Sequence, residues 1–115
     1  MENTPTITMD VQWRNGRQAL VALKGELRMA SVSTPRRKLL QLTRKNPEIL
    51  VIDLTEVSTI DTAGIAVLVE VLRAVHVRGG KLRLNGLSDQ VRKMVGLTSL
   101  DQILGVHDSK QAEYV

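Results

Sequence analysis

The sequence contains no cysteine and no phenylalanine, and it has one Trp, one Tyr and three Pro among its 115 residues. Without cysteine the chain forms no disulfide and carries no thiol chemistry, which favours a reducing compartment, and we expect a cytoplasmic protein. With so few aromatic rings, the core has to be packed from Leu, Val, Ile and Ala, which the 43% hydrophobic content supplies. The same scarcity disfavours nucleic acid binding by base stacking.

Long apolar runs are also missing, and the N-terminus has no basic start followed by an apolar stretch. No segment approaches the roughly eighteen apolar residues of a membrane span, so we expect neither a signal peptide nor direct membrane insertion. No shift in composition marks a linker, and the length is that of one ordinary domain. We therefore expect a single domain over 1–115, with frayed ends at 1–4 and 109–115.

Positive charge is the one compositional excess: the formal net charge is +4, with basic clusters at 36–38, 44–45 and 81–83. A basic patch can meet nucleic acid or an acidic protein surface. No nucleic-acid-reading motif accompanies these clusters. We therefore expect no nucleic acid partner and interpret the clusters as solvated surface.

Catalytic and cofactor-binding patterns are not found. The two histidines, His76 and His107, lie in different predicted elements without Cys or ligand-spaced carboxylates, so we expect no metal site. The Asp61-Thr62 pair has no identifiable His or Lys base to activate the hydroxyl, so we expect no enzymatic activity. No glycine-rich segment has the Lys and Ser/Thr spacing of a phosphate-binding loop, so we expect no cofactor.

Two strands joined by a hairpin are predicted at the start of the chain. Apolar and polar residues alternate over 6–13, and a second strand-like run covers 18–27. Between them stands Asn15-Gly16, a dipeptide typical of tight hairpin turns. These two strands are therefore expected to be antiparallel.

Helices and strands alternate after the hairpin. A first helix is predicted with Thr34 as its N-cap and Pro35 at the first helical position. The apolar run 48–54 is typical of a central strand covered on both faces, and spacings of three and four residues predict a second helix over 61–78.

The remaining elements complete an α/β pattern. A strand is predicted from residue 81, followed by short helices over 88–95, capped by Ser88, and 97–104, capped by Thr98. Helical crossovers favour parallel neighbouring strands, whereas the opening hairpin does not. The fold class predicted is α/β, with a mixed central sheet of four to five strands and about four helices.

Polar residues gather where the predicted central strand meets the second helix, in STIDTAGIAVL (58–68). One interpretation is structural: Asp61 caps the free amides of the helix, and Gly64 lets the first turn approach a neighbouring backbone. The other is functional, because a helix that begins at the carboxyl end of a strand is where α/β sheets present groups to partners. A phosphate on Thr62 would add negative charge next to Asp61 and disrupt a surface fitted to the neutral hydroxyl. Both interpretations remain open at this point.

Two longer stretches resemble a known family. VIDLTEVSTIDTAGIAVLVEVL (51–72) and RGGKLRLNGLSDQVRKMVGLTSLDQIL (78–104) resemble the STAS domain family, in particular the bacterial anti-sigma factor antagonists. The resemblance extends from LKGEL (23–27) through residue 104. It implies a non-catalytic domain that binds an anti-sigma factor with Ser/Thr kinase activity and thereby frees a sigma factor.

In such domains, phosphorylation of an Asp-Ser/Thr-Ser/Thr-Gly loop switches partner binding off. The resemblance places Asp61, Thr62, Ala63 and Gly64 at these four positions. Ala63 removes the second of the two candidate hydroxyls, so Thr62 is the candidate phosphoacceptor. Ser58, which lies slightly upstream with a neighbouring threonine, is interpreted as a turn former.

The loop also resembles the small STAS subunit of Mla-type lipid-transport ABC systems. That resemblance implies a domain that binds an ABC ATPase subunit, with Thr62 as a contact residue rather than necessarily a phosphoacceptor. The sequence leaves open which branch applies, the identity of the partner, the oligomeric state and any nucleotide or lipid ligand.

The second helix is predicted to turn one side to the sheet and to leave several apolar residues outward. Its expected sheet-facing residues are Ile65, Leu68, Val69, Leu72 and Val75. Its expected outward residues are Ala66, Val67, Glu70, Arg73, Ala74 and Val77, with Val71 at the margin. The outward apolar residues are either scattered surface positions or a docking strip beside Thr62. The expected partner-binding residues are Ser58, Thr59, Asp61, Thr62, Ala63, Gly64, Val67, Glu70, Val71 and Ala74.

Overall fold

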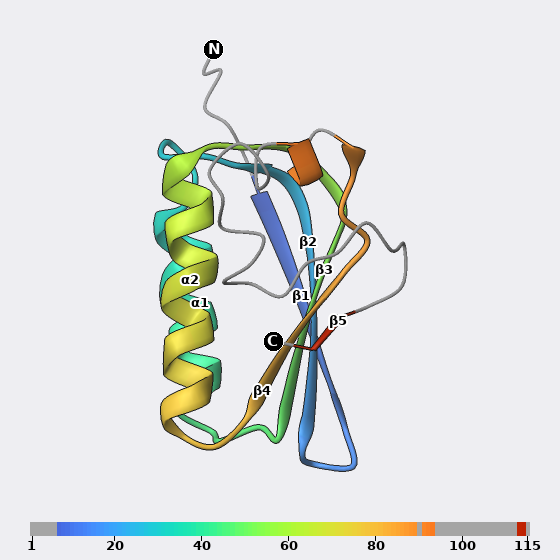
Figure 1. Cartoon of the computed structure of the whole chain (residues 1–115), viewed down its shortest axis with the longest axis vertical. Coiled ribbons are helices and arrows are strands. Elements are labelled where there is room, and N and C mark those ends of the chain that lie inside the picture. Colours follow the sequence, from blue (N-terminus) through green and yellow to red (C-terminus); the bar gives the residue numbers. More distant parts are fainter. Residues whose placement is uncertain (1–6, 90, 94–112, 115) are drawn as a thin grey trace.

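The computed structural model describes residues 7–89, 91–93 and 113–114. These residues form a five-stranded sheet in the order β1-β2-β3-β4-β5, with two helices packed on one face (Figure 1). The elements are β1 (Ile7–Arg14), β2 (Gln18–Leu27), α1 (Ser33–Thr43), β3 (Ile49–Ile60), α2 (Thr62–Val77), β4 (Lys81–Asn85) and β5 (Glu113–Tyr114). The pairs β1–β2 and β4–β5 are antiparallel, whereas β2–β3 and β3–β4 are parallel. The predicted α/β fold with a mixed sheet is confirmed.

The opening hairpin forms at the predicted dipeptide. Asn15 and Gly16 both have positive φ angles, 55° and 67°, and the Arg17 N–H donates to the Arg14 carbonyl oxygen across the turn at 3.1 Å. Two consecutive left-handed residues give the turn a twist that matches the two flanking strands. The sequence therefore determines this connection locally.

The predicted N-cap of α1 is wrong. The helix begins at Ser33, the cap position is Val32, and no side chain caps the helix. Pro35 is the third helical residue, where its missing N–H would have had no partner within the helix. Val32 is buried in the core, so packing rather than a capping hydroxyl determines where the helix starts.

The predicted turn at Ser58 and Thr59 is also wrong, because β3 continues through the polar run as far as Ile60. The carboxyl end of β2 pairs with this segment, with Thr59 opposite Glu26, after two local register shifts. The Ser58 hydroxyl donates to the Gly25 carbonyl oxygen at 3.3 Å. Pairing with the neighbouring strand therefore overrides the turn preference of these residues.

The core lies between the sheet and the two helices. Leu50, Ile52 and Leu54 of β3 are fully buried and alternate along the strand, so they share the face that the helices cover. Val51, on the opposite face, is also buried. This agrees with the prediction of a central strand that buries both faces.

The buried side of α2 is wider than predicted. Of the residues predicted to face the sheet, Ile65, Leu68, Leu72 and Val75 are buried, but Val69 is only half-buried, so its predicted position is wrong. Val67 and Val71, by contrast, are 3% and 0% exposed. The helix α1 packs beside α2, so a second side of α2 is covered. The predicted outward position of Val67 and marginal position of Val71 are therefore wrong.

An ion pair joins the two helices at this contact. The guanidinium of Arg36 in α1 donates from Nε and Nη2 to the two carboxylate oxygens of Glu70 in α2, each at 2.7 Å. Hydrogen bonds from Arg36 and its charge hold the pKa of Glu70 below its usual value, against a smaller opposing effect of burial. Glu70 thus pairs across the helices, not with Arg73 along α2 as its spacing suggests.

The carboxyl-terminal part is described in pieces. The cap predicted at Ser88 is present, because its hydroxyl accepts from the Val91 N–H at 3.3 Å, and residues 89 and 91–93 are helical. The helix predicted over 97–104 lies outside the described residues. Within the tail expected to fray, 113–114 form β5 against β4.

Neither α1 nor α2, nor any other helix in the described part of the chain, has both the length and the apolar character to span a membrane.

The first turn of α2 lies against the end of β2 because Gly64 has no side chain. A Cβ at this buried position would overlap the carbonyl oxygen of Leu27 and would lie 2.7 Å from Cγ1 of Ile60. Since that oxygen belongs to the backbone of a paired strand, it has little freedom to move away. The predicted close approach at Gly64 is therefore present.

Replacement Gly64→Ala is expected to destabilise the fold, because the methyl group has no room beside Leu27 and Ile60. Overpacking of this kind costs about 1–3 kcal/mol. Urea unfolding followed by circular dichroism would measure it. Ala66→Ser, an exposed change one half-turn away, is the control and is expected to shift stability by no more than about 0.5 kcal/mol. Equal stability of Gly64→Ala and the unmodified chain would contradict the packing described here.

Candidate functional site

The candidate site lies at the edge of the sheet where the parallel strands β2 and β3 end. The segment 28–31 follows β2, and Asp61 and α2 follow β3, so the two segments meet at the same edge (Figure 1). Ligands and partners of α/β sheets commonly bind at the carboxyl ends of the strands. The polar cluster singled out in the sequence is positioned at this edge.

Asp61 connects the two segments through its carboxylate. Oδ1 accepts a hydrogen bond from the Gly64 N–H in the first turn of α2, and Oδ2 accepts one from the Met29 N–H, both at 3.0 Å. The backbone N–H of Asp61 donates to the Leu27 carbonyl oxygen at 3.3 Å. Asp61 is thus the N-cap of α2, as the structural interpretation predicted, and it also holds the segment after β2 in place.

The pKa of the Asp61 carboxyl lies below its usual value. Partial burial acts to raise this pKa, but hydrogen bonds from the amides of Met29, Gly64 and Ala63 lower it, and the positive charge of Arg28 adds to the decrease. Asp61 is therefore ionised at neutral pH. It places a negative charge next to the residue that follows it.

Thr62 is the first residue of α2, and its side chain is exposed. Ala63 is half-buried, and Gly64 is buried beneath it. A second molecule can therefore reach the hydroxyl of Thr62. The hydroxyl lies at the positive end of the α2 dipole and beside the ionised Asp61.

Ser58 and Thr59 approach this edge from β3 instead of from a turn. Ser58 is exposed and Thr59 is half-buried, and the Thr59 hydroxyl donates to the Glu26 carboxylate at 3.5 Å. Glu26 also pairs with Arg28 at 3.3 Å. Polar side chains from β2 and β3 therefore line the sheet edge next to the start of α2.

The expected partner surface on α2 is only partly present at the molecular surface. Val67 and Val71 are buried, and Glu70 is engaged with Arg36, so these three do not form a free strip. Ala74 is half-buried. The exposed side of α2 is instead the stripe Thr62, Ala66, Arg73, His76 and Val77, with Val69 half-buried within it.

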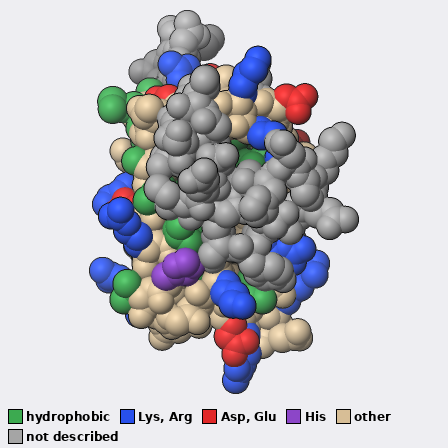
Figure 2. Space-filling model, viewed as in Figure 1, with side chains coloured by type: hydrophobic (Ala, Val, Ile, Leu, Met, Phe, Trp, Pro, Cys, Tyr) green, Lys and Arg blue, Asp and Glu red, His purple; other side chains and the backbone are tan. Residues whose placement is uncertain are grey.

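This exposed stripe mixes apolar and basic groups. Val77 is 86% exposed, and His76 is exposed on the face of the molecule shown in Figure 2. Lys and Arg side chains are also seen along the helical edge of the molecule in Figure 2. The exposed stripe includes Ala66 but not the predicted Val67 and Val71, because α1 covers the side of α2 on which those two residues lie.

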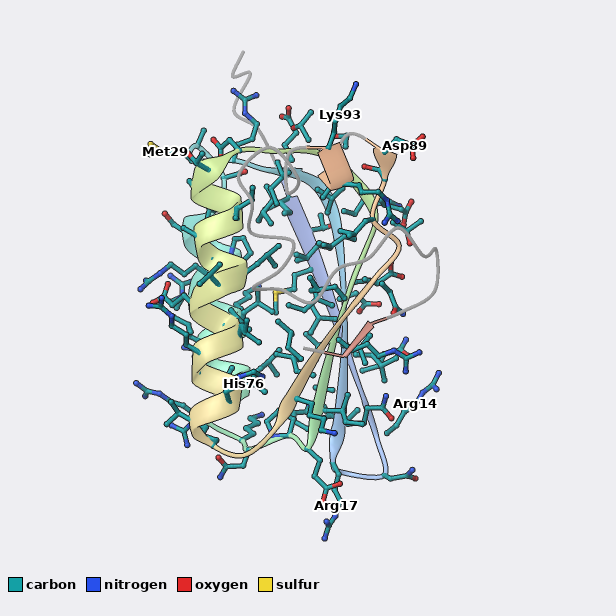
Figure 3. The ribbon with its side chains drawn as sticks, in the orientation of Figure 1. Arg14, Arg17, Met29, His76, Asp89 and Lys93 are labelled. Atoms are coloured by element: carbon teal, nitrogen blue, oxygen red, sulfur yellow. The ribbon has the colours of Figure 1, made fainter. Side chains whose placement is uncertain are left out.

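Met29 is a site residue that the sequence did not identify. Its side chain is 74% exposed, and its N–H is held by Asp61, so it lies beside the start of α2 (Figure 3). This side chain places exposed apolar atoms beside the first turn of α2. The sequence could have indicated Met29 only through the expected parallel pairing of the strands that end at 27 and 60, because such pairing brings the segments that follow the two strands together.

The site offers hydroxyl, carboxylate and apolar groups. Among the residues that the structure describes, no three His, Cys, Asp or Glu side chains are grouped so that they could hold a metal ion. What the geometry provides is an exposed hydroxyl on a rigid helix start, flanked by apolar contact residues.

Comparison with known proteins identifies the family of the chain. The family model for the STAS domain matches residues 9–112. The anti-sigma-B factor antagonist of Bacillus subtilis (strain 168) is 31% identical over 100 residues, which cover 87% of this chain and 90% of that protein.

Two solved structures share the fold. The anti-sigma factor antagonist from Mycobacterium paratuberculosis superposes with a TM-score of 0.78 at 22% identity, covering 90% of this chain and 86% of that one. The phosphorylated form of the Bacillus cell fate determinant SpoIIAA superposes with a TM-score of 0.67 at 18% identity, covering 83% and 86%. From the family match over nearly the whole chain, the sequence relative and the shared fold, the chain belongs to the STAS domain family.

Proposed function

We propose that this chain is a non-catalytic cytoplasmic regulator that binds an anti-sigma factor with Ser/Thr kinase activity and so releases a sigma factor. The observation that carries the proposal is the exposed Thr62 hydroxyl at the first residue of α2, held there by the bonds of Asp61. The similarity to the anti-sigma-B factor antagonist of Bacillus subtilis supports the choice of partner class.

The docking surface is centred on the start of α2. Thr62, Ala66 and the half-buried Val69 lie along one side of the helix, and Met29 extends this surface from the segment after β2. Small and apolar side chains around a hydroxyl form a surface that excludes water well when a partner covers it. The buried Val67 and Val71 support the helix from within and do not contact the partner.

Phosphorylation of Thr62 would reverse this binding. A phosphate adds about −1.5 to −2 charges at neutral pH and would stand next to the ionised Asp61. The amides of the first helical turn offer partial compensation in the free domain, but they are covered or redirected in a complex fitted to the neutral hydroxyl. Burying an unmatched charge costs on the order of several kcal/mol, which changes occupancy by orders of magnitude. The solved phosphorylated SpoIIAA is a structural neighbour of this chain and makes such a modification worth testing here.

The replacement Thr62→Glu is expected to weaken binding to an anti-sigma kinase by about ten-fold or more, because it brings a permanent charge into the contact. Thr62→Val, which keeps the shape and removes only the hydroxyl, is expected to retain more of the affinity. Isothermal titration calorimetry would give both dissociation constants. Because Thr62 is exposed, neither change should alter the unfolding midpoint appreciably.

Incubation with the kinase and ATP is expected to place one phosphate on Thr62, detected by mass spectrometry, and Thr62→Val should abolish it. A dissociation constant unchanged by Thr62→Glu would argue against the switch. An unmodified protein that co-purifies with an ABC ATPase subunit would instead support the role of a lipid-transport subunit, with Thr62 as a contact residue.

Replacement Asp61→Asn is expected to lower stability at neutral pH by about 0.5–1.5 kcal/mol, because the amide oxygen can still cap α2 but the amide nitrogen cannot accept from the second N–H, so one hydrogen bond and the charge are lost. The folded-state pKa of Asp61 is lowered, so its contribution is present above the unfolded pKa and is lost as the pH falls through the folded one. Urea unfolding at several pH values should therefore show the gap between the two proteins shrinking below roughly pH 4. A gap that is independent of pH would contradict the role of the charge. Glu56→Gln, at an exposed position of β3 whose surface ion pair with Lys24 contributes little, is the control.

A further inference from the structure

The strand β1 is the long free edge of the sheet. It pairs only with β2 in the part of the chain that the structure describes, and its eight residues keep one unbroken antiparallel register from Ile7 opposite Gly25 to Arg14 opposite Gln18. It contains no Pro and no bulge, two features that prevent an edge strand from pairing further, and its two charged side chains, Asp10 and Arg14, are of opposite sign. A regular edge of this length presents a row of backbone donors and acceptors to another strand.

The two faces of β1 are chemically distinct. Ile7, Met9, Val11 and Trp13 point to the side of the helices, and the first three are half-buried whereas Trp13 is 36% exposed. Thr8, Asp10, Gln12 and Arg14 alternate with them and are exposed on the opposite face. The strand therefore carries an apolar row along the helical side and a polar row along the other.

The polar row is complementary to itself. Asp10 and Arg14 lie on the same face at equal spacing from Gln12, and neither belongs to an ion pair among the described residues. If two β1 strands run antiparallel with Gln12 opposite Gln12, each Asp10 stands opposite Arg14 of the second copy. In the same register, each Val11 stands opposite Trp13 of the second copy. Opposite charges and aromatic–aliphatic pairs at directly opposed positions are both favourable.

We propose that β1 pairs antiparallel with β1 of a second copy of this chain, which joins the two sheets into one across a two-fold axis at Gln12. A second copy fits better than an unrelated peptide, because the charge pattern of β1 matches its own reverse. Closed two-fold pairing also leaves no new edge at the junction, so it ends in a dimer and not in a fibre.

The dimer leaves the candidate site free. Thr62 follows the carboxyl end of β3, and because β1 is antiparallel to the neighbouring β2, this is the end of the sheet at which β1 begins. In an antiparallel β1 pair, the two strands begin at opposite ends. The two Thr62 sites therefore lie at opposite ends of the joined sheet. The surface that pairs the two copies is separate from the start of α2, so the dimer can form whether or not the proposed function is correct.

Sedimentation velocity of the full chain over a concentration series is the test, with fluorescence of Trp13 as a second readout. Trp13 is the single Trp of the chain, so its emission reports this edge alone. We expect a dimer at high concentration and a blue shift of the emission that follows the dimer fraction, because Val11 of the second copy covers the ring. A wild-type chain that stays monomeric up to its solubility limit would overturn the proposal.

Charge reversal identifies the register. Asp10→Arg and Arg14→Asp are each expected to weaken the dimer by about ten-fold or more, because they place like charges opposite each other. The double variant D10R/R14D restores opposite charges and is expected to restore the dimer. Arg73→Asp, the same charge change on the exposed side of α2, is the control and should leave the dimer unchanged. A dimer insensitive to the single reversals, or not restored in the double variant, would overturn the proposal, and circular dichroism verifies that each variant is folded.

Discussion

The carboxylate of Asp61 is the interaction on which the geometry of this protein's site depends. It accepts hydrogen bonds from the Gly64 N–H and the Met29 N–H, and so it joins the start of α2 to the segment after β2. The bonds require α2 to begin directly against the end of β2, which is possible only because Gly64 carries no side chain. Thr62, which lies between Asp61 and Gly64, is thereby presented on a rigid helix start and not on a free loop.

The ionised state of Asp61 links this geometry to the proposed regulation. Amide donors and Arg28 keep the carboxylate charged, so the Thr62 hydroxyl lies next to a permanent negative charge. In the proposed switch, a neutral hydroxyl is compatible with that neighbour, whereas a phosphate would require compensation that a partner surface fitted to the hydroxyl would not offer. The same residue that builds the site therefore also increases the electrostatic effect of modifying it.

Two edges of the sheet have different roles in this description. The carboxyl ends of the parallel strands carry the site, where side chains and a helix start converge, and β1 presents backbone groups along the strand. The proposed partner binding at the first and the proposed self-pairing at the second would involve different surfaces and different chemistry. The helix α1 is joined to α2 through the ion pair of Arg36 and Glu70.

Local signals predicted several elements. Asn15-Gly16 determined the hairpin because both residues tolerate positive φ, and helical spacing predicted α2 with Asp61 as its cap. The start of α1 and the path of Ser58 through β3 were mispredicted, because packing of Val32 and pairing with β2 outweighed local preferences.

The sequence by itself determined the α/β class, the order of the elements from β1 to β4 and the polar cluster at 61–64, since these follow from hydrophobic period, capping and turn chemistry. Only the tertiary structure decided which side of α2 is exposed, because helical spacing describes an apolar stripe but not how many neighbours cover it. The placement of α1 buried Val67 and Val71. Parallel pairing of β2 with β3 brought Met29 to Asp61, a contact between residues far apart in the chain that no local pattern encodes.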